Sequence, residues 1–135
     1  MKANELMIGD WISYIEDGNL YYARVSEVYK PSVFTEDGEF EGREVEEDEI
    51  IPVQITPEIL EKNGFKKDYN GDFELIEEGY GIRVVRRGDV YAFTLTAGRD
   101  ITDMVRFAIH QVGPFSVHWV QHALKLCGIE LEIKL

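Results

Sequence analysis

Residues 51–65 (IPVQITPEILEKNGF) contain the signal for a short helix whose start and end are both specified by the sequence. Thr56 is placed to cap the N-terminus of this helix, and Pro57 suits its first position because the missing proline N–H has no intrahelical partner there. Gly64 predicts a left-handed turn at the C-terminus, and Phe65 is placed for the apolar contact that closes such a turn. We therefore expect strands before this helix, and further strands with a longer helix after it.

Two β-hairpins are predicted ahead of the short helix. An Asp-Gly pair at 17–18 separates the apolar stretches 11–15 and 20–29, which is a strong signal for a two-residue turn. A second Asp-Gly pair lies at 37–38. Short strands joined by such turns predict a small barrel of SH3-like type, and the phrase at residues 8–12 (IGDWI) is similar to the entry strand of such barrels.

After the short helix, residues 66–72 predict a polar loop, and the strands that follow it are predicted at 73–77, 82–86, 90–96 and 104–110. A longer helix is predicted at 117–127, with a buried stripe of Val117, Val120, Leu124 and Cys127. Apolar and charged residues alternate through 129–135, which predicts a half-buried strand beside that helix.

Together these elements predict an α+β protein. Residues 1–55 are expected to form an SH3-like β-barrel half, and residues 56–135 the connecting helix, a second antiparallel sheet and one C-terminal helix, packed as one compact unit. A chain of 135 residues can bury roughly two-thirds of its unfolded surface without a disulfide. The single cysteine, Cys127, favours a reducing compartment, and the chain shows no secretory signal or membrane span, so we expect a cytoplasmic protein.

The net charge of −12 argues against direct nucleic-acid binding, which needs clustered Lys and Arg. Residues 36–49 hold nine carboxylates against the single base Arg43. We interpret this acidic stretch as a solvated hairpin edge. A docking surface for a basic partner and weak binding of divalent ions remain alternatives, although the residue spacing of a calcium loop is absent.

No catalytic set is evident in the sequence. His118 and His122 are spaced to share one side of a helix, so both could reach one metal ion. Trp119 stands where a zinc hydrolase of the H-E-x-x-H type needs its general-base glutamate. Cys127 lies near the negative end of the predicted helix, which disfavours a reactive thiolate. We therefore expect no metal, no cofactor and structural roles for these residues.

Aromatic residues are the remaining candidates for a binding site. They crowd the predicted barrel, and those that do not enter its core could line a peptide groove of the kind that SH3-like domains use. The candidates are Trp11, Tyr14, Tyr22, Tyr29 and Phe34.

Three segments also resemble a known family. They are KANELMIGDWI at residues 2–12, IP at 51–52 with TPEILEKNGF at 56–65, and VH at 117–118 with Gln121 and LKLCGI at 124–129. They are similar to a group of small proteins from gut anaerobes, often encoded in prophages or other mobile elements, for which no activity is established. Family members often carry Glu-Leu where this chain has Trp119-Val120, so a catalytic glutamate is not the purpose of that position. The resemblance implies a cytoplasmic accessory protein of a mobile element.

The sequence leaves three hypotheses about function. The first is a protein-binding module that uses the aromatic residues of the barrel half. The second is an enzyme with a site between the two halves. The third is an acidic DNA mimic, which would need carboxylates spaced along one elongated face. The oligomeric state stays open.

Overall fold

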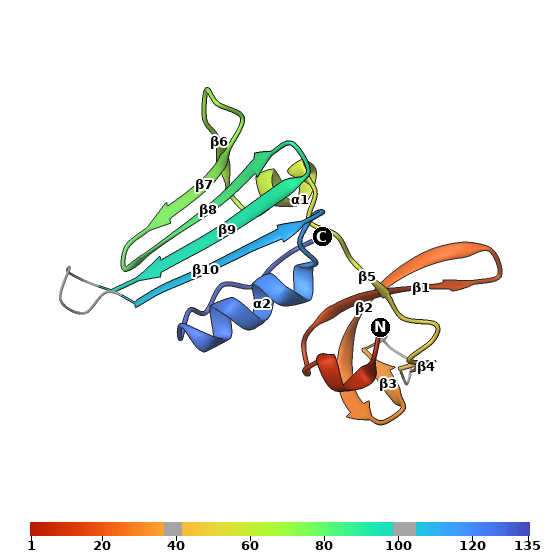
Figure 1. The fold of residues 1–135 in the computed structure, drawn as a ribbon. Coiled ribbons are helices and arrows are strands. Elements are labelled where there is room, and N and C mark those ends of the chain that lie inside the picture. The colour runs from red at the N-terminus through yellow and green to blue at the C-terminus, as the bar shows by residue number, and fades with distance from the viewer. Residues whose placement is uncertain (37–41, 99–104) are drawn as a thin grey trace. The chain divides into compact units, whose positions relative to one another are not determined.

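The computed structural model describes residues 1–36, 42–98 and 105–135. It divides into two compact units: the first is Met1–Val53 with Ser116–His118, and the second is Gln54–Phe115 with Trp119–Leu135. Each unit is built on one antiparallel sheet, and helices are few, so the mixed α+β class predicted from the sequence is confirmed (Figure 1).

The first unit has, among the described residues, five strands in the spatial order β4-β3-β2-β1-β5. Their bounds are β1 (Trp11–Glu16), β2 (Asn19–Tyr29), β3 (Ser32–Thr35), β4 (Glu44–Glu46) and β5 (Ile51–Pro52). A short 3₁₀ helix, η1 (Ala3–Glu5), precedes them. The sheet curls into half a barrel (Figure 1).

The tight turn between β1 and β2 confirms the prediction from the Asp-Gly pair at 17–18. Asp17 and Gly18 both have positive φ angles, 50° and 77°, as a two-residue hairpin turn of type I′ requires. Glu16 and Asn19 pair on either side of it. The predicted turn at 37–38 lies outside the described residues.

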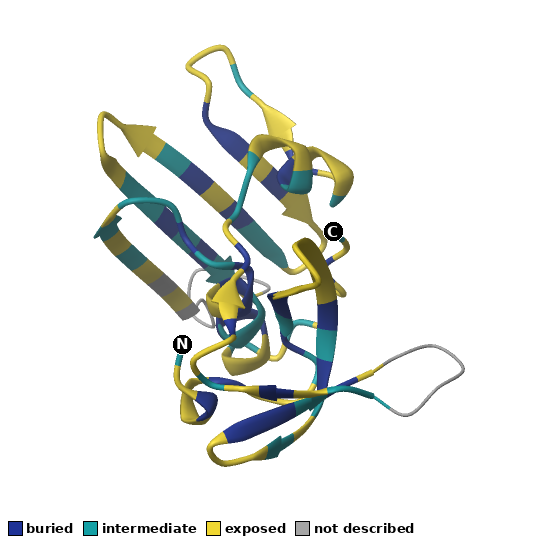
Figure 2. Ribbon diagram, turned by 90° about the vertical axis from the view of Figure 1, so that its right-hand side faces the viewer, coloured by how far each residue is buried: buried dark blue, intermediate teal, exposed yellow. Residues whose placement is uncertain are grey.

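The core of the first unit lies against one face of the curled sheet. Ile12, Val25, Val33 and Val45 come from four different strands and are completely buried. Ala3 of η1 is also completely buried in this cluster. In the middle of β2, buried Ala23 and Val25 alternate with the more exposed Tyr22 and Arg24, as expected when one face of a sheet is covered; Figure 2 colours the chain by burial.

The second unit has, in the described part of the chain, five strands in the spatial order β10-β9-β8-β7-β6. Their bounds are β6 (Lys66–Lys67), β7 (Phe73–Glu77), β8 (Tyr80–Arg87), β9 (Val90–Ala97) and β10 (Val105–Val112). Strands β7 to β10 lie where the sequence predicts them, within a few residues at each end.

Strand β6 was missed, because its residues were assigned to a polar loop. Lys67 pairs with Phe73 across a short hairpin. The Asp68 carboxylate accepts the N–H groups of Asn70 (2.8 Å) and Asp72 (3.1 Å), and this side-chain turn brings the two strand ends together.

The short helix α1 (Pro57–Lys62) begins and ends as predicted. The Thr56 hydroxyl oxygen accepts a backbone N–H of the first turn at 3.2 Å. At the other end Gly64 has a φ of 87°, and the Phe65 N–H donates to the Leu60 carbonyl oxygen at 3.0 Å. Leu60 and Phe65 are both buried, which completes the predicted apolar closure.

One face of the second sheet carries its core, which consists of Phe73, Leu75, Ile82, Val84, Phe93 and Leu95. The helix α2 (Val117–Leu126) runs along this face (Figure 1). Val120, Ala123 and Leu124 are its buried residues in the second unit. Cys127, predicted to extend the buried stripe, is only half-buried, because it lies beyond the last residue of the helix.

The strand predicted at 129–135 is not present. The alternation of apolar and charged residues does reflect burial, since Ile133 is buried. The backbone of this tail, however, forms hydrogen bonds with a side chain and not with a neighbouring strand. The Asn63 side chain accepts the Lys134 N–H at 2.8 Å and donates to the Lys134 carbonyl oxygen at 2.7 Å. It also donates to the Ile59 carbonyl oxygen at 2.7 Å. Asn63 therefore joins the end of α1 to the C-terminal tail.

We predict that Asn63→Ala lowers the free energy of unfolding by about 1–3 kcal/mol, because it leaves several polar groups without their partner. The Lys134 amide should also lose protection against hydrogen exchange. Denaturant unfolding and exchange measured by NMR test both effects. Glu61→Ala, at an exposed position of α1, is the matched control. Equal unfolding free energies and equal Lys134 exchange in the two variants would contradict this role of Asn63.

Candidate functional site

The five aromatic residues predicted to bind do not form one groove. Tyr14 is buried in the core of the first unit, where its ring stacks on Tyr21 at 5.8 Å between centroids. Trp11 and Tyr22 alternate with the core positions and therefore lie on the opposite face of the β1–β2 hairpin.

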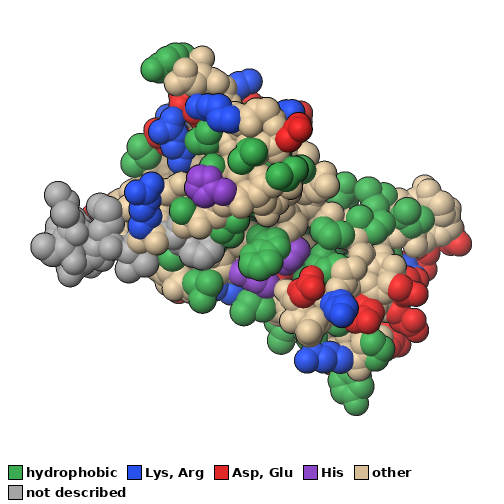
Figure 3. Space-filling model, in the orientation of Figure 1, with side chains coloured by type: hydrophobic (Ala, Val, Ile, Leu, Met, Phe, Trp, Pro, Cys, Tyr) green, Lys and Arg blue, Asp and Glu red, His purple; other side chains and the backbone are tan. Residues whose placement is uncertain are grey.

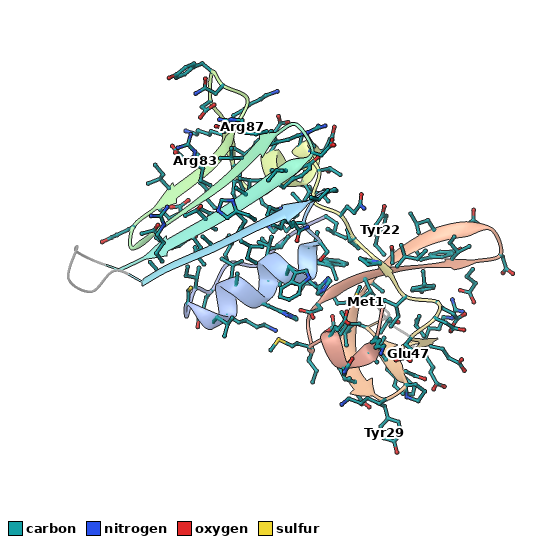
Figure 4. All side chains as sticks on the ribbon, viewed as in Figure 1. Met1, Tyr22, Tyr29, Glu47, Arg83 and Arg87 are labelled. Atoms are coloured by element: carbon teal, nitrogen blue, oxygen red, sulfur yellow. The ribbon has the colours of Figure 1, made fainter. Side chains whose placement is uncertain are left out.

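Tyr29 and Phe34 lie at a different place, on β2 and β3. Phe34 is half-buried opposite Glu27, whereas Tyr29 is 72% exposed. Figure 4 shows Tyr22 and Tyr29 at opposite ends of the first unit. The structure thus brings together only Trp11 and Tyr22 of the predicted set.

Those two residues belong to an apolar surface that we call the outer hairpin face: Trp11, Ile15, Leu20, Tyr22 and Ile51. The register of the strands places these side chains on one side of β2, β1 and β5, with Ile15 opposite Leu20. Ile15, Leu20 and Tyr22 are at least half exposed, at 56%, 50% and 55%. Figure 3 shows hydrophobic side chains gathered over this hairpin.

Two contacts fix the geometry of the outer hairpin face. The guanidinium group of Arg24 lies 4.9 Å from the centre of the Trp11 ring, its cross-strand neighbour. The buried Ser13 hydroxyl donates to the Ile51 carbonyl oxygen at 3.0 Å, which attaches β5 to β1 beneath this surface. The face therefore presents an ordered apolar surface with one cation at its edge.

The acidic stretch at 36–49 is partly structural. Residues 37–41 lie outside the described part. Of the others, Glu49 forms an ion pair with Arg43 (3.3 Å) and accepts the Glu46 N–H at 3.0 Å. Glu47 accepts the Ala3 N–H at 3.3 Å, which fixes η1 to the turn after β4. Two carboxylates of the stretch thus hold the fold together as well as keeping a surface solvated.

His118 and His122 lie on the helix α2, and Cys127 follows its last residue. His118 was expected off the buried side of its helix but is only 4% exposed, and its neighbour Val117 is completely buried. The His122 ring lies 6.2 Å from the Trp119 ring, between ring centres. Among the described residues, no group of three or more His, Cys, Asp or Glu side chains is arranged to hold a metal ion.

The arginine residues of β8 lie on both faces of the second sheet. Arg83 and Arg87 lie on the face opposite the core, where both bind the buried carboxylate of Asp72 (Figure 4). Arg87 makes two hydrogen bonds to it, at 2.7 and 3.0 Å, and Arg83 makes one at 3.2 Å. The hydrogen bonds from Arg87, more than any other contact, hold the pKa of Asp72 below its ordinary value.

On the core side of the same sheet, a cavity of about 240 Å³ lies beside α1. Its apolar walls include Leu60, Phe73, Val84, Tyr91 and Phe115. Lys67 and Arg86 are the charged residues that line it, and both are cationic. We call this site the cationic-rim pocket.

Strand register fixes both cations of the cationic-rim pocket. Lys67 pairs with Phe73 across β6 and β7, and its ammonium nitrogen lies 5.9 Å from the centre of that ring. Arg86 pairs with Tyr91 across β8 and β9, and its guanidinium carbon lies 5.5 Å from the centre of the ring. Each cation is thus held over an aromatic ring that lines the pocket.

The sequence did not single out Lys67 or Arg86. Arg86 stands between Arg83 and Arg87 in a strand, and alternation alone would have separated it from Arg87. Lys67 was hidden because its strand was not recognised. The sequence could therefore have indicated this pocket only if the correct strand register had been known.

Comparisons with protein-family models, curated proteins and solved structures find no match to this chain. Within residues 1–36, 42–98 and 105–135, none of the helices has the length and apolar character needed to cross a bilayer.

We predict that Asp72→Asn lowers the stability of the protein at neutral pH. A carboxyl group whose pKa is lower in the folded chain stabilises the fold above its unfolded pKa, and that stabilisation is lost as the pH falls through the folded value. The difference in urea midpoint between parent and Asp72→Asn should therefore be full at neutral pH and shrink as the pH falls below about 4. Glu74→Gln, an exposed carboxylate on the same face, is the control. A midpoint difference independent of pH would refute the ion-pair account.

Proposed function

We propose that this chain is a protein-binding module whose first unit is an SH3-like barrel and whose contact surface is the outer hairpin face. The observation that supports it most is the exposure of Ile15, Leu20 and Tyr22 together on one face of a paired hairpin. Contiguous apolar surface in contact with water commonly marks an interaction site.

The composition of the outer hairpin face suits a protein partner. Tryptophan, tyrosine and arginine carry much of the binding energy at protein interfaces, and the face holds Trp11 and Tyr22 with Arg24 beside them. The strand β1, which carries Trp11 and Ile15, is paired with β2 on one side and with β5 on the other. Its backbone is therefore already ordered, and little conformational entropy is lost when a partner binds. An apolar patch on another protein is the occupant that this chemistry favours.

The acidic stretch gives less support to the alternative of a DNA mimic. Glu47 and Glu49 accept backbone N–H groups within the first unit, and Glu49 is neutralised by Arg43. Carboxylates used in this way are not presented as a free row of charges.

The cellular setting is a further part of the proposal. The three sequence segments that resemble proteins of mobile elements support an accessory role for such an element. The single cysteine, Cys127, suits the reducing cytoplasm. The proposed module would thus bind a host or element protein inside the cell.

The test is affinity capture from a lysate of the source cell with three baits: the parent, Leu20→Thr/Tyr22→Thr and Tyr29→Thr. Threonine keeps strand propensity while removing the apolar surface. We expect the parent and Tyr29→Thr to enrich the same protein, and the double variant to bind the purified partner about tenfold more weakly or worse.

Tyr29→Thr is the matched control, since Tyr29 is an exposed aromatic residue of the same unit that lies off the outer hairpin face. Sedimentation of the parent alone shows whether the partner is a second copy of the chain. The proposal is wrong if no interaction, with itself or with another protein, depends on Leu20 and Tyr22.

A further inference from the structure

We infer that the cationic-rim pocket is a second binding site, and that its ligand is a small aromatic or branched apolar molecule bearing a carboxylate. This site lies wholly within the second unit and uses none of the residues of the outer hairpin face. It is therefore independent of the proposed protein-binding function.

The size of the pocket sets the size of the ligand. An apolar cavity of about 150 Å³ is large enough for benzene. The cationic-rim pocket has a volume of about 240 Å³, so it has room for a single ring with a short side chain. The rings of Phe73, Tyr91 and Phe115 are available to contact such a group.

The charge at the rim sets the polarity of the ligand. Lys67 and Arg86 line the pocket, and among the residues that the structure describes no carboxylate lines it with them. In a chain of net charge −12, a site whose described charged residues are both cations has a local potential of the opposite sign. A carboxylate on the ligand would pair with these groups while its apolar part fills the space below.

The two cations are held ready for such a ligand. Each lies over the ring of its cross-strand neighbour, and the Nε–H of Arg86 donates to the Gly88 carbonyl oxygen at 3.0 Å. That hydrogen bond leaves the terminal nitrogens of Arg86 as the donors for a bidentate contact with a carboxylate. The neighbouring Arg83 and Arg87 are directed to Asp72 on the other face and do not compete for the ligand.

The experiment is an NMR titration of the full chain with 3-phenylpropanoate and, separately, with the neutral 3-phenylpropanamide. We expect the carboxylate to shift the resonances of Val84, Tyr91 and Phe115, with a dissociation constant in the millimolar range or below, as for a small fragment. The amide should bind about tenfold more weakly, because it lacks the charge that pairs with the rim.

Two variants and one control test whether the rim cations are the groups that bind the carboxylate. Arg86→Gln and Lys67→Gln should each weaken binding of the carboxylate several-fold, and the two residues are exposed, so the fold is retained. Lys66→Gln removes the adjacent exposed cation outside the pocket and should leave binding unchanged. Absence of shifts at the pocket, equal affinity for the amide, or equal affinity of Lys66→Gln and Arg86→Gln would each overturn the inference.

Discussion

The second unit depends on the packing of one side chain, Phe115, which lies just before α2. Its ring meets Phe93 and Tyr91 edge-on, with centroid distances of 5.9 and 6.3 Å. Its carbonyl oxygen accepts the Ile55 N–H at 2.7 Å, so the same residue fixes the chain that leads into α1. Phe115 thus ties the segment that leads into α1 to the sheet. The ten residues of α2 extend about 15 Å, whereas the eight residues of β9 span about 26 Å, so α2 alone cannot cover the whole face.

What covers the rest of that face is assembled from distant parts of the chain. Ile133 of the C-terminal tail lies with Val120 and Phe93 around a residual gap of only about 10 Å³, so the layer is nearly closed there. On the other side of Leu60 the layer leaves the cationic-rim pocket. The positive charge of the pocket follows from strand alternation, because successive side chains of β8 point to opposite faces. Arg86 therefore lies on the pocket side, and Arg87 lies on the side of Asp72. The outer hairpin face arises in the same way, as the uncovered side of the first sheet.

Local features of this fold were predictable, and the features that depend on distant pairing were not. The turn at Asp17 and the ends of α1 follow from residues that are neighbours in sequence, so the sequence predicts them correctly. The C-terminal tail was assigned to a strand because its pairing partner, Asn63, is a side chain far away in the sequence. For the candidate site, the sequence offers Trp11 and Tyr22 among five aromatic candidates, but only the strand register shows that these two share a face while Tyr14 enters the core.

The covering layer of the second sheet leaves an apolar cavity beside Phe115. The most direct test is the response of side-chain methyl resonances to dissolved xenon, which enters apolar cavities of this size without needing a charged group. We expect shifts at Val84 and Leu60, which line the pocket, and much smaller ones at Val120 and Ile133, where the layer is nearly closed. Uniform small shifts at all four residues, or the largest shifts at Val120 and Ile133, would contradict it.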